Sequence, residues 1–235
     1  MSLLQTADVE RILAELSRKR PVFHSEGDFQ FALAFKMQQK RPHLRLRLET
    51  PVISKGRPRV DILASCEGCV LFLELKYLPR SLHAQVQIAE GEHETYDLCD
   101  QAREWGRYDF LKDITRIETW VAECTQHCPE AVGYAILLTN DQNYWNKLND
   151  ENAKDYAFQL HDNRTIAGGE VLTWGERATA SDVKGRKHPI VLRWGYRFQW
   201  RDYSELAPPL AKPLRGSRID HGKFRYLLVR VPPSG

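Results

Sequence analysis

The sequence predicts an α/β protein with a mixed central sheet and a β-rich extension toward its C-terminal end. Two observations carry this prediction. Apolar residues recur at helical spacing in two segments near the start and in one long segment further on. Between these segments lie short stretches in which apolar and polar residues alternate, or in which apolar residues follow one another almost without a break. The resulting order of helix, three strands, helix and strand up to about residue 140 is typical of an α/β core.

Two helices are expected first. Residues 7–19 carry an apolar stripe at helical spacing, and Pro21 cannot continue a helix. The second helix is expected to begin after Ser25 and to end near Gln39. Ser25 followed three residues later by Asp28 resembles a capping box in which Asp replaces the usual Glu or Gln.

Three strands are expected next. Residues 44–49 and 59–64 alternate between apolar and polar side chains, and residues 70–77 form a nearly continuous apolar run, typical of a strand buried on both faces. A long helix is predicted from about Tyr96 to Cys124. A further central strand is predicted over the apolar segment that follows this helix, residues 133–139.

The pattern is weaker in the second half of the chain. Residues 144–159 fit a helix, residues 190–200 and 224–231 are predicted strands, and the proline-containing segment 207–216 is expected to cross the surface. We divide the chain accordingly. Residues 1–160 are expected to form the core with its N-terminal helix, and residues 161–235 are expected to form a basic, β-rich portion packed on that core.

The composition sets the class of protein. Hydrophobic residues make up 42% of the 235 and charged residues 28%, which excludes a disordered, collagenous or coiled-coil chain. No apolar run approaches the 18 residues that membrane spanning needs, so we expect no membrane partner. The N-terminus lacks a basic start before an apolar run, and the five cysteines are an odd number. We therefore expect a cytoplasmic protein with reduced thiols.

The net charge of +3 hides an uneven distribution. From Lys184 to the end of the chain, 12 basic residues stand against three acidic ones, a balance of +9. The first 183 residues hold 22 basic and 28 acidic residues, a balance of −6. The basic C-terminal quarter favours a polyanionic partner, and an ordinary solvated surface is the alternative.

Two charged residues interrupt the most apolar predicted strand. Glu74 and Lys76 are two residues apart, so their side chains lie on the same face of the strand. A charge in such a place is costly unless it is paired or bound to a metal ion. Taken alone, the two residues are also compatible with a structural ion pair.

Asp61 changes this interpretation. If Glu67 and Gly68 form a two-residue hairpin turn, Asp61 lies directly opposite Glu74 across the strand pair. Like charges repel at that distance, and folded proteins keep such pairs mainly where a cation or a shared proton offsets the repulsion. Carboxylate oxygens with room for water suit Mg²⁺ or Mn²⁺ rather than Zn²⁺.

Glu26 supplies a third carboxylate. On the second predicted helix it shares a face with apolar positions and one glutamine, namely Phe29, Gln30, Leu33 and Met37. An acid on a core-facing stripe is uncommon. Glutamate is also favoured in the first turn of any helix by the helix dipole, which is the alternative explanation.

Together these residues resemble the PD-(D/E)XK nuclease superfamily, which has a restriction-endonuclease-like αβββαβ core. The resemblance covers about residues 22–140 and rests on Glu26 in the first helix of that core, Asp61 on the second strand, and Glu74 and Lys76 on the third. Val60 stands where the family pattern has a proline.

The resemblance implies a metal-dependent phosphodiesterase. Asp61 and Glu74 would ligate Mg²⁺ or Mn²⁺, the carbonyl of Leu75 would be a further ligand, and Glu26 would complete the site directly or through water. Lys76 would orient the attacking water or stabilise the developing negative charge. A protonated Lys76 in a mostly acidic site favours these two roles over that of general base.

We therefore expect a nuclease that hydrolyses DNA phosphodiester bonds, as an endonuclease. A catalytically inactive nucleic-acid-binding or assembly module with the same fold is the alternative from another class. RNA as substrate and a homodimeric state both remain open.

Weaker candidates lie outside this cluster. Some branches of the superfamily have a glutamine on the helix after the third strand that borders the active site, and Gln101 is the residue here; a solvated helix surface is the alternative. Arg193, Arg197 and Arg201 share the polar face of the strand predicted over residues 190–200, which makes them candidate phosphate contacts. The aromatic residues on its other face fit a protein core, and base stacking is the alternative.

The cysteines do not predict a zinc site. Cys66 and Cys69 have the spacing of a metal-binding knuckle, but tetrahedral zinc needs two more ligands. Residues 124–128 could supply them only if the fold brought the two segments together. In the hairpin expected here, Cys66 and Cys69 flank the turn.

Overall fold

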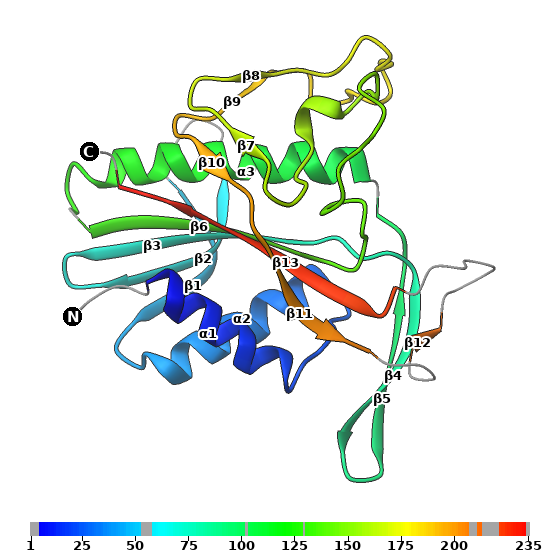
Figure 1. Cartoon of the computed structure of the whole chain (residues 1–235). Coiled ribbons are helices and arrows are strands. Elements are labelled where there is room, and N and C mark those ends of the chain that lie inside the picture. Colours follow the sequence, from blue (N-terminus) through cyan, green and yellow to red (C-terminus); the bar gives the residue numbers. More distant parts are fainter. Residues whose placement is uncertain are drawn as a thin grey trace.

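A computed structural model of the chain describes residues 5–52, 58–101, 103–128, 130–206, 211–212 and 221–233. Over these residues it confirms an α/β protein with three α-helices, a mixed six-stranded sheet and smaller β-sheets (Figure 1). The strand order of the large sheet is β1-β2-β3-β6-β13-β11. Its β3 and β6 are parallel, and its other neighbouring strands are antiparallel.

The large sheet and its helices follow the chain in this order: α1 (Thr6–Ser17), α2 (Glu26–Lys40), β1 (Arg45–Pro51), β2 (Arg59–Cys66), β3 (Cys69–Tyr77), α3 (Arg103–Cys124), β6 (Glu130–Thr139), β11 (Trp200–Glu205) and β13 (Lys223–Val231). The smaller sheets pair β12 (Ala211–Lys212) with β4 (Leu82–Ala89) and β4 with β5 (Glu92–Leu98), β7 (Thr165–Ile166) with β10 (Tyr196–Arg197), and β8 (Val171–Leu172) with β9 (Ile190–Val191). Both N-terminal helices, the first three strands, β6 and β13 confirm the sequence predictions.

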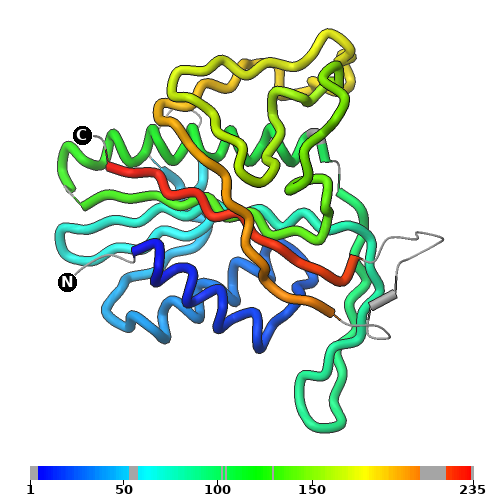
Figure 2. Tube along the Cα trace, in the orientation of Figure 1, coloured from blue at the N-terminus to red at the C-terminus, as the bar shows by residue number. Residues whose placement is uncertain are grey.

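Helices cover both faces of the large sheet. The helices α1 and α2 lie on one face, and α3 lies on the other, with the segment between β6 and β11 beyond it (Figures 1 and 2). Each face has its own hydrophobic core. Because β11 and β13 extend the same sheet as β3 and β6, the residues after 160 contribute two strands to the core sheet. The division of the chain at residue 160 stays a prediction.

The hairpin between β2 and β3 has the predicted register. Cys66 faces Cys69, and the pairing continues to Ile62 opposite Leu73. Gly68, the second residue of the turn, has a φ of +71°, which glycine adopts without strain.

The expectation of five reduced thiols is wrong for one pair. Cys66 and Cys69 are joined as a disulfide, because the hairpin register places them opposite each other with 5.1 Å between their Cα atoms. The Sγ of Cys128 lies 3.0 Å from the carbonyl oxygen of Gly68, so this cysteine borders the same turn.

The predicted helix from Tyr96 to Cys124 begins too early. Tyr96 belongs to β5, and α3 begins at Arg103. An unforeseen hairpin of β4 and β5 precedes it, with a turn at Gly91, whose φ is +76°. Alternating residues in β4 carried the signal: Leu82, Ala84 and Val86 are buried, whereas Gln85 and Gln87 are exposed.

The strand predicted over residues 190–200 is divided among β9, β10 and the start of β11. A side chain of α3 causes the interruption. The carboxylate of Glu118 accepts the backbone N–H groups of Arg193 and Trp194, at 2.9 and 3.1 Å, and the hydroxyl of Tyr196. These N–H groups therefore bond to a helix and not to a strand. The alternate residues Leu192, Tyr196, Phe198 and Trp200 are buried, as a core face requires.

The helix predicted over residues 144–159 is wrong except for one turn of 3₁₀ helix at Tyr156–Phe158. Short polar side chains bond to nearby backbone groups here, which competes with helix formation. The carboxylates of Asp141 and Asp150 each accept the N–H group two residues on. The buried Arg107 of α3 binds the carbonyl of Asn143 and the carboxylate of Asp155, each at 2.5 Å.

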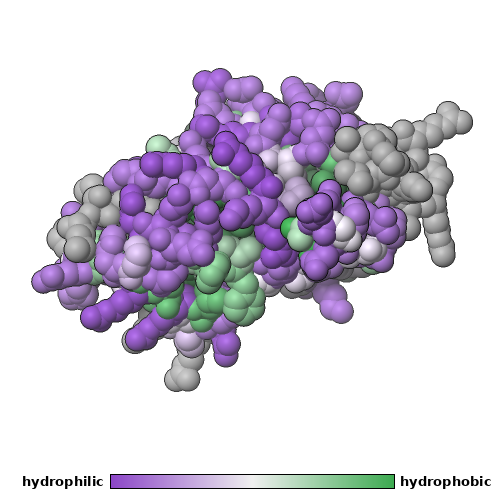
Figure 3. Space-filling model, turned by 90° about the horizontal axis from the view of Figure 1, so that it is seen from below, coloured by the Kyte–Doolittle hydropathy of each residue, from purple (hydrophilic) through white to green (hydrophobic). Residues whose placement is uncertain are grey.

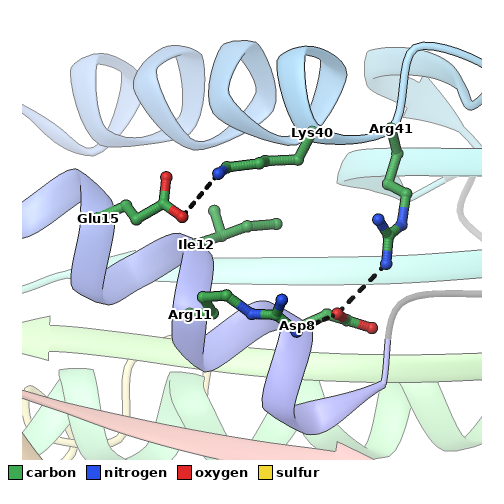
Figure 4. A pocket seen from close by; sticks show the side chains of 6 residues that line it. All are labelled: Asp8, Arg11, Ile12, Glu15, Lys40 and Arg41. Atoms are coloured by element: carbon green, nitrogen blue, oxygen red, sulfur yellow. Dashed lines mark hydrogen bonds and ion pairs between the residues drawn. The ribbon is translucent and has the colours of Figure 1, made fainter.

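Ion pairs join α1 to α2 around a hollow of about 40 Å³ (Figure 4). Glu15 lies 2.7 Å from Lys40 and 2.9 Å from Lys36, and Asp8 lies 3.3 Å from Arg41. Hydrogen bonds from the two lysines lower the pKa of Glu15 to about 2. These pairs account for the charges of the hollow, so it offers no free group for chemistry.

The outer face of the α1–α2 layer carries an apolar patch among hydrophilic residues (Figure 3). On α2, Phe31 and Phe35 are about two-thirds exposed. None of the helices in the described ranges is long and apolar enough to cross a lipid bilayer.

The contact between α3 and β6 can be tested at Gly133. A methyl group added at this position would overlap the side chain of Ile117, which is fully buried. We expect Gly133→Ala to lower the free energy of unfolding by about 1–3 kcal/mol, as overpacking does in well-packed cores. Urea unfolding measures the change. The control is Gly27→Ala in α2, where a methyl group would meet nothing closer than 3.8 Å; equal stability of both variants would contradict the packing described here.

Candidate active site

The candidate site lies where the β2–β3 ladder ends. The paired positions stop at Ile62 and Leu73, although both strands continue. Beyond this point two carboxylates accept backbone N–H groups of β3. Asp61 accepts from Leu75 at 2.6 Å, and Glu26 accepts from Tyr77 at 2.9 Å. The end of the ladder thus brings a residue of β2 and a residue of α2 to one stretch of β3.

The neighbouring strand also leaves Asp61 without a ladder partner. The β1–β2 pairing includes Leu48 and Thr50 but omits Glu49, whose φ of +49° is uncommon for a residue with a side chain. The amide of Gln30 on α2 donates to the Asp61 carbonyl at 2.6 Å and to the Glu49 carboxylate at 2.9 Å. Asp61 is therefore held by side chains where a regular sheet would use backbone.

Two residues of α3 complete the cluster on the other face of β3. Lys76 Nζ lies 3.0 Å from Asp113 and 4.0 Å from Glu26. One guanidinium nitrogen of Arg116 lies 2.5 Å from Glu74 and 2.9 Å from Asp113. The structure thus brings the four predicted residues, Glu26, Asp61, Glu74 and Lys76, into one cluster. Asp113 and the cationic Arg116 also belong to it.

Burial raises the pKa of every carboxyl group in this cluster. Burial is the largest cause for Asp61, whose pKa rises from 3.8 to about 6, and the charges of Glu26 and Asp113 add to the rise. The pKa values of Glu26, Glu74 and Asp113 are raised for the same main reason. Burial therefore disfavours the ionised form of each of these carboxyl groups, and a nearby cation would offset that cost.

Lys76 is the positively charged centre of the cluster. Burial would lower the pKa of its ammonium group, but the charges of Asp113 and Glu26 outweigh burial, and the pKa is raised. Lys76 therefore stays protonated in this structure and is suited to orienting or stabilising an anion rather than to accepting a proton.

The donor chemistry of the cluster fits a divalent cation. Glu74 is 1% exposed, and its Oε1 has no hydrogen-bond partner in the described part of the chain. The carbonyl of Leu75, a predicted ligand, accepts from Lys76 Nζ at 3.2 Å, so it lies at the same site. Carboxylate and carbonyl oxygens are ligands that Mg²⁺ and Mn²⁺ prefer.

The side chains are not arranged around a common centre, however. Among the described residues, no group of three or more His, Cys, Asp or Glu side chains is placed to hold a metal ion. The contacts give the reason, because Glu74 is turned to Arg116 and Asp113 to Lys76 and Arg116. The cations of the chain itself neutralise the acids in this arrangement.

Gln101 precedes α3 and does not lie within it. Gln101 and Glu26 line the same open hollow of about 420 Å³, which lies beside the end of β3 and is bordered by His24, Tyr77, Pro79 and Leu98. This hollow gives the cluster access to solvent at the Glu26 side.

The three arginines predicted on one strand do not form a row. Arg197 lies in β10 of a small sheet and donates to Asn163 at 2.9 Å, whereas Arg201 lies in β11 of the large sheet and pairs with Glu10 of α1 at 3.0 Å. Arg193 lies in the connection between β9 and β10. The prediction that they project together is wrong, because the strand predicted to carry them is interrupted.

Sequence reasoning missed Asp113 and Arg116. The signal that singled out Glu26 applies to Asp113, which is an acid three residues after Phe110 and four before Ile117 on a buried helical stripe. Gln30 and Glu49 were also missed as neighbours of Asp61. No feature of the sequence pointed to Glu49, because its role depends on an irregular backbone that the alternating pattern of residues conceals.

No protein-family model and no curated protein matches this chain. The assignment of the site therefore depends on its residues and geometry.

The raised pKa of Asp61 predicts a pH dependence of stability in metal-free protein. A carboxyl group with a higher pKa in the folded state binds its proton more tightly when folded, so stability falls as pH rises from about 4 to about 6 and stays reduced above. Asp61→Asn removes this term. We expect the variant to be more stable than wild type at pH 8 by about 1–3 kcal/mol, with no difference near pH 4.

Urea unfolding between pH 4 and pH 8 in the presence of a chelator measures this effect. The control is Glu123→Gln on α3, which removes an exposed carboxylate and should leave the pH profile unchanged. Parallel profiles for wild type and Asp61→Asn would show that the Asp61 carboxyl group is not perturbed.

Proposed function

We propose that this chain is a divalent-metal-dependent nuclease that hydrolyses DNA phosphodiester bonds as an endonuclease, on a restriction-endonuclease-like αβββαβ core. One observation carries the proposal: Glu26, Asp61, Glu74 and Lys76 meet where the β2–β3 ladder ends. The order α2, β1, β2, β3, α3, β6, with β6 parallel to β3, supports the proposed core. The β4–β5 hairpin is an insertion in that order.

The carboxylates of Asp61 and Glu74 would hold Mg²⁺ or Mn²⁺, with the carbonyl of Leu75 and, directly or through water, Glu26. A bound ion of this kind supplies polarisation of the phosphoryl oxygen and a lower pKa for its water. The N–H groups of Leu75 and Tyr77 fix the orientation of Asp61 and Glu26 before any ion is present. This preorganisation supports the proposal that the two carboxylates belong to a metal-binding site.

Lys76 would stabilise negative charge that develops on the phosphate and orient the attacking water. Its ammonium group is protonated, and Asp113 holds it at 3.0 Å. A fixed positive charge in a largely buried site stabilises a developing anion more strongly than the same charge in water.

The alternative is an inactive nucleic-acid-binding or assembly module. The observation that favours it is the internal pairing of charges, since Arg116 with Glu74 and Lys76 with Asp113 form ion pairs without any external partner. The two functions differ in metal binding and cleavage, which decide between them.

Arg45 and Arg47 of β1 are further candidates for contacts to the DNA backbone. They lie opposite Ser65 and Leu63 of β2, and Leu63 packs against the core on the α3 side of the sheet, so alternation places both arginines on the face that also carries Glu74 and Lys76. Both are exposed, and no acidic residue of the described chain pairs with either. Free cations beside a cluster of acids are suited to position a polyanion over it.

The nuclease proposal is tested by a DNA-cleavage assay with Mg²⁺ and with a chelator, on supercoiled plasmid, linear duplex and RNA. We expect metal-dependent nicking of the plasmid by wild type. Asp61→Ala should abolish cleavage and weaken Mn²⁺ binding because it removes a ligand. Lys76→Met should lower cleavage by at least about 100-fold without weakening Mn²⁺ binding, because it removes only positive charge.

The matched control for Lys76→Met is Lys112→Met, which removes an exposed lysine from α3. This control should cleave as wild type does. Wild-type protein that binds DNA but neither binds Mn²⁺ nor cuts any substrate would establish the inactive module instead.

The DNA path is tested by salt dependence of binding. Arg45→Gln combined with Arg47→Gln should weaken DNA binding without sequence preference and reduce the slope of log affinity against log salt by about 0.9 for each lost contact. Neutralising Arg193, Arg197 and Arg201 together should have a smaller effect, because Arg197 and Arg201 already have protein partners. A larger effect of the triple variant would place the DNA on the C-terminal side.

A further inference from the structure

We propose that Arg116 is the resident counter-cation of the site and sets its affinity for the divalent ion. A divalent ion would take over Glu74 from the guanidinium group, so Arg116 acts as a positioning residue that opposes metal binding. This inference rests on the proposed function, because it assumes that Glu74 is a metal ligand.

The contacts of Glu74 are the first step of the argument. Its Oε2 binds the Arg116 guanidinium at 2.5 Å, and its Oε1 has no hydrogen-bond partner in the described residues. Glu74 is almost fully buried, so the ion pair is shielded from water. A buried carboxylate with a free oxygen and a single cationic partner can accept a second cation or exchange the first.

The position of Arg116 allows such an exchange. Its side chain is 31% exposed, whereas those of Glu74 and Asp113 are 1% and 4% exposed, so the guanidinium lies on the solvent side of both acids. A cation that approaches Glu74 from this side, rather than through the hollow beside Glu26, meets Arg116 before it meets Glu74. Arg116 therefore competes with it by charge and by position.

The structure also provides a place for Arg116 once Glu74 is taken. The guanidinium carbon lies 5.6 Å from the centre of the Trp120 ring, within range of a cation–π interaction. The same guanidinium group contacts Asp113 at 2.9 Å. These two contacts keep Arg116 beside the site without Glu74, so an incoming ion need not remove it from the protein.

Isothermal titration calorimetry with Mn²⁺ on metal-free full-length protein tests the inference. Arg116→Met should bind Mn²⁺ about tenfold or more tightly than wild type, because removal of a unit positive charge a few ångströms away favours a divalent cation. Arg116→Lys retains the charge and should bind within about threefold of wild type. Lys112→Met, four residues earlier on the same helix and exposed, should bind within about twofold of wild type.

Thermal unfolding supplies a readout that does not depend on calorimetry. Without metal, Arg116→Met leaves Glu74 and Asp113 without one cation and should melt at a lower temperature than wild type. Saturating Mn²⁺ should raise its melting temperature by more than it raises that of wild type, because tighter binding stabilises the folded state more. If Arg116→Met does not fold without metal, Arg116→Gln, which retains a hydrogen-bond donor, is measured in its place.

The outcomes separate this inference from the proposed function. Equal or weaker Mn²⁺ binding by the Arg116→Met or Arg116→Gln variant, with measurable binding by wild type, overturns the role of Arg116 and leaves the nuclease proposal intact. Absence of Mn²⁺ binding in wild type and in the variants overturns both. Binding by a neutral variant where wild type shows none would support the inference in its strongest form.

Discussion

Two backbone N–H groups of β3 organise the candidate site. The N–H groups of Leu75 and Tyr77 lie beyond the end of the β2–β3 ladder, and a buried N–H group without an acceptor is costly. Asp61 and Glu26 supply the acceptors. The same two hydrogen bonds that satisfy the strand bring one acid from another strand and one from a helix to a single place. Burial there raises the pKa values of both acids. The cluster of perturbed acids at the site thus results from an interrupted sheet.

Helix α3 links this site to the C-terminal part of the chain. Toward β3 it presents Asp113 and Arg116, which balance the charges of Lys76 and Glu74. Away from β3, the buried Glu118 accepts the backbone of the connection between β9 and β10. One helix therefore balances charge at the site and anchors the segment between β6 and β11 that lies over the helix (Figure 1). Its position follows from the parallel β3–β6 pair, since such a pair requires a crossover connection.

Local sequence predicted what depends on local physics. The hairpin turn at Gly68 sets the register of β2 against β3, and this register is enough to predict that Asp61 lies near Glu74. What could not be predicted depends on partners distant in sequence. Glu118 interrupts a strand predicted about 75 residues later, and the balance of charge at Glu74 depends on Arg116, 42 residues away. A side chain that replaces a strand partner leaves no trace in the alternation of residues on which strand prediction depends.

The order of strands in the large sheet has a consequence for how the protein forms. The strand β13, residues 223–231, lies between β6 and β11, so β6 keeps an open hydrogen-bonding edge until β13 has been synthesised. Every residue of the candidate site precedes β6, and the site can therefore take shape on the ribosome while the sheet beside it is unfinished. An apolar strand with an open edge is prone to pair with other chains. Between synthesis of β6 and synthesis of β13 the chain therefore carries an open apolar edge that β13 later covers.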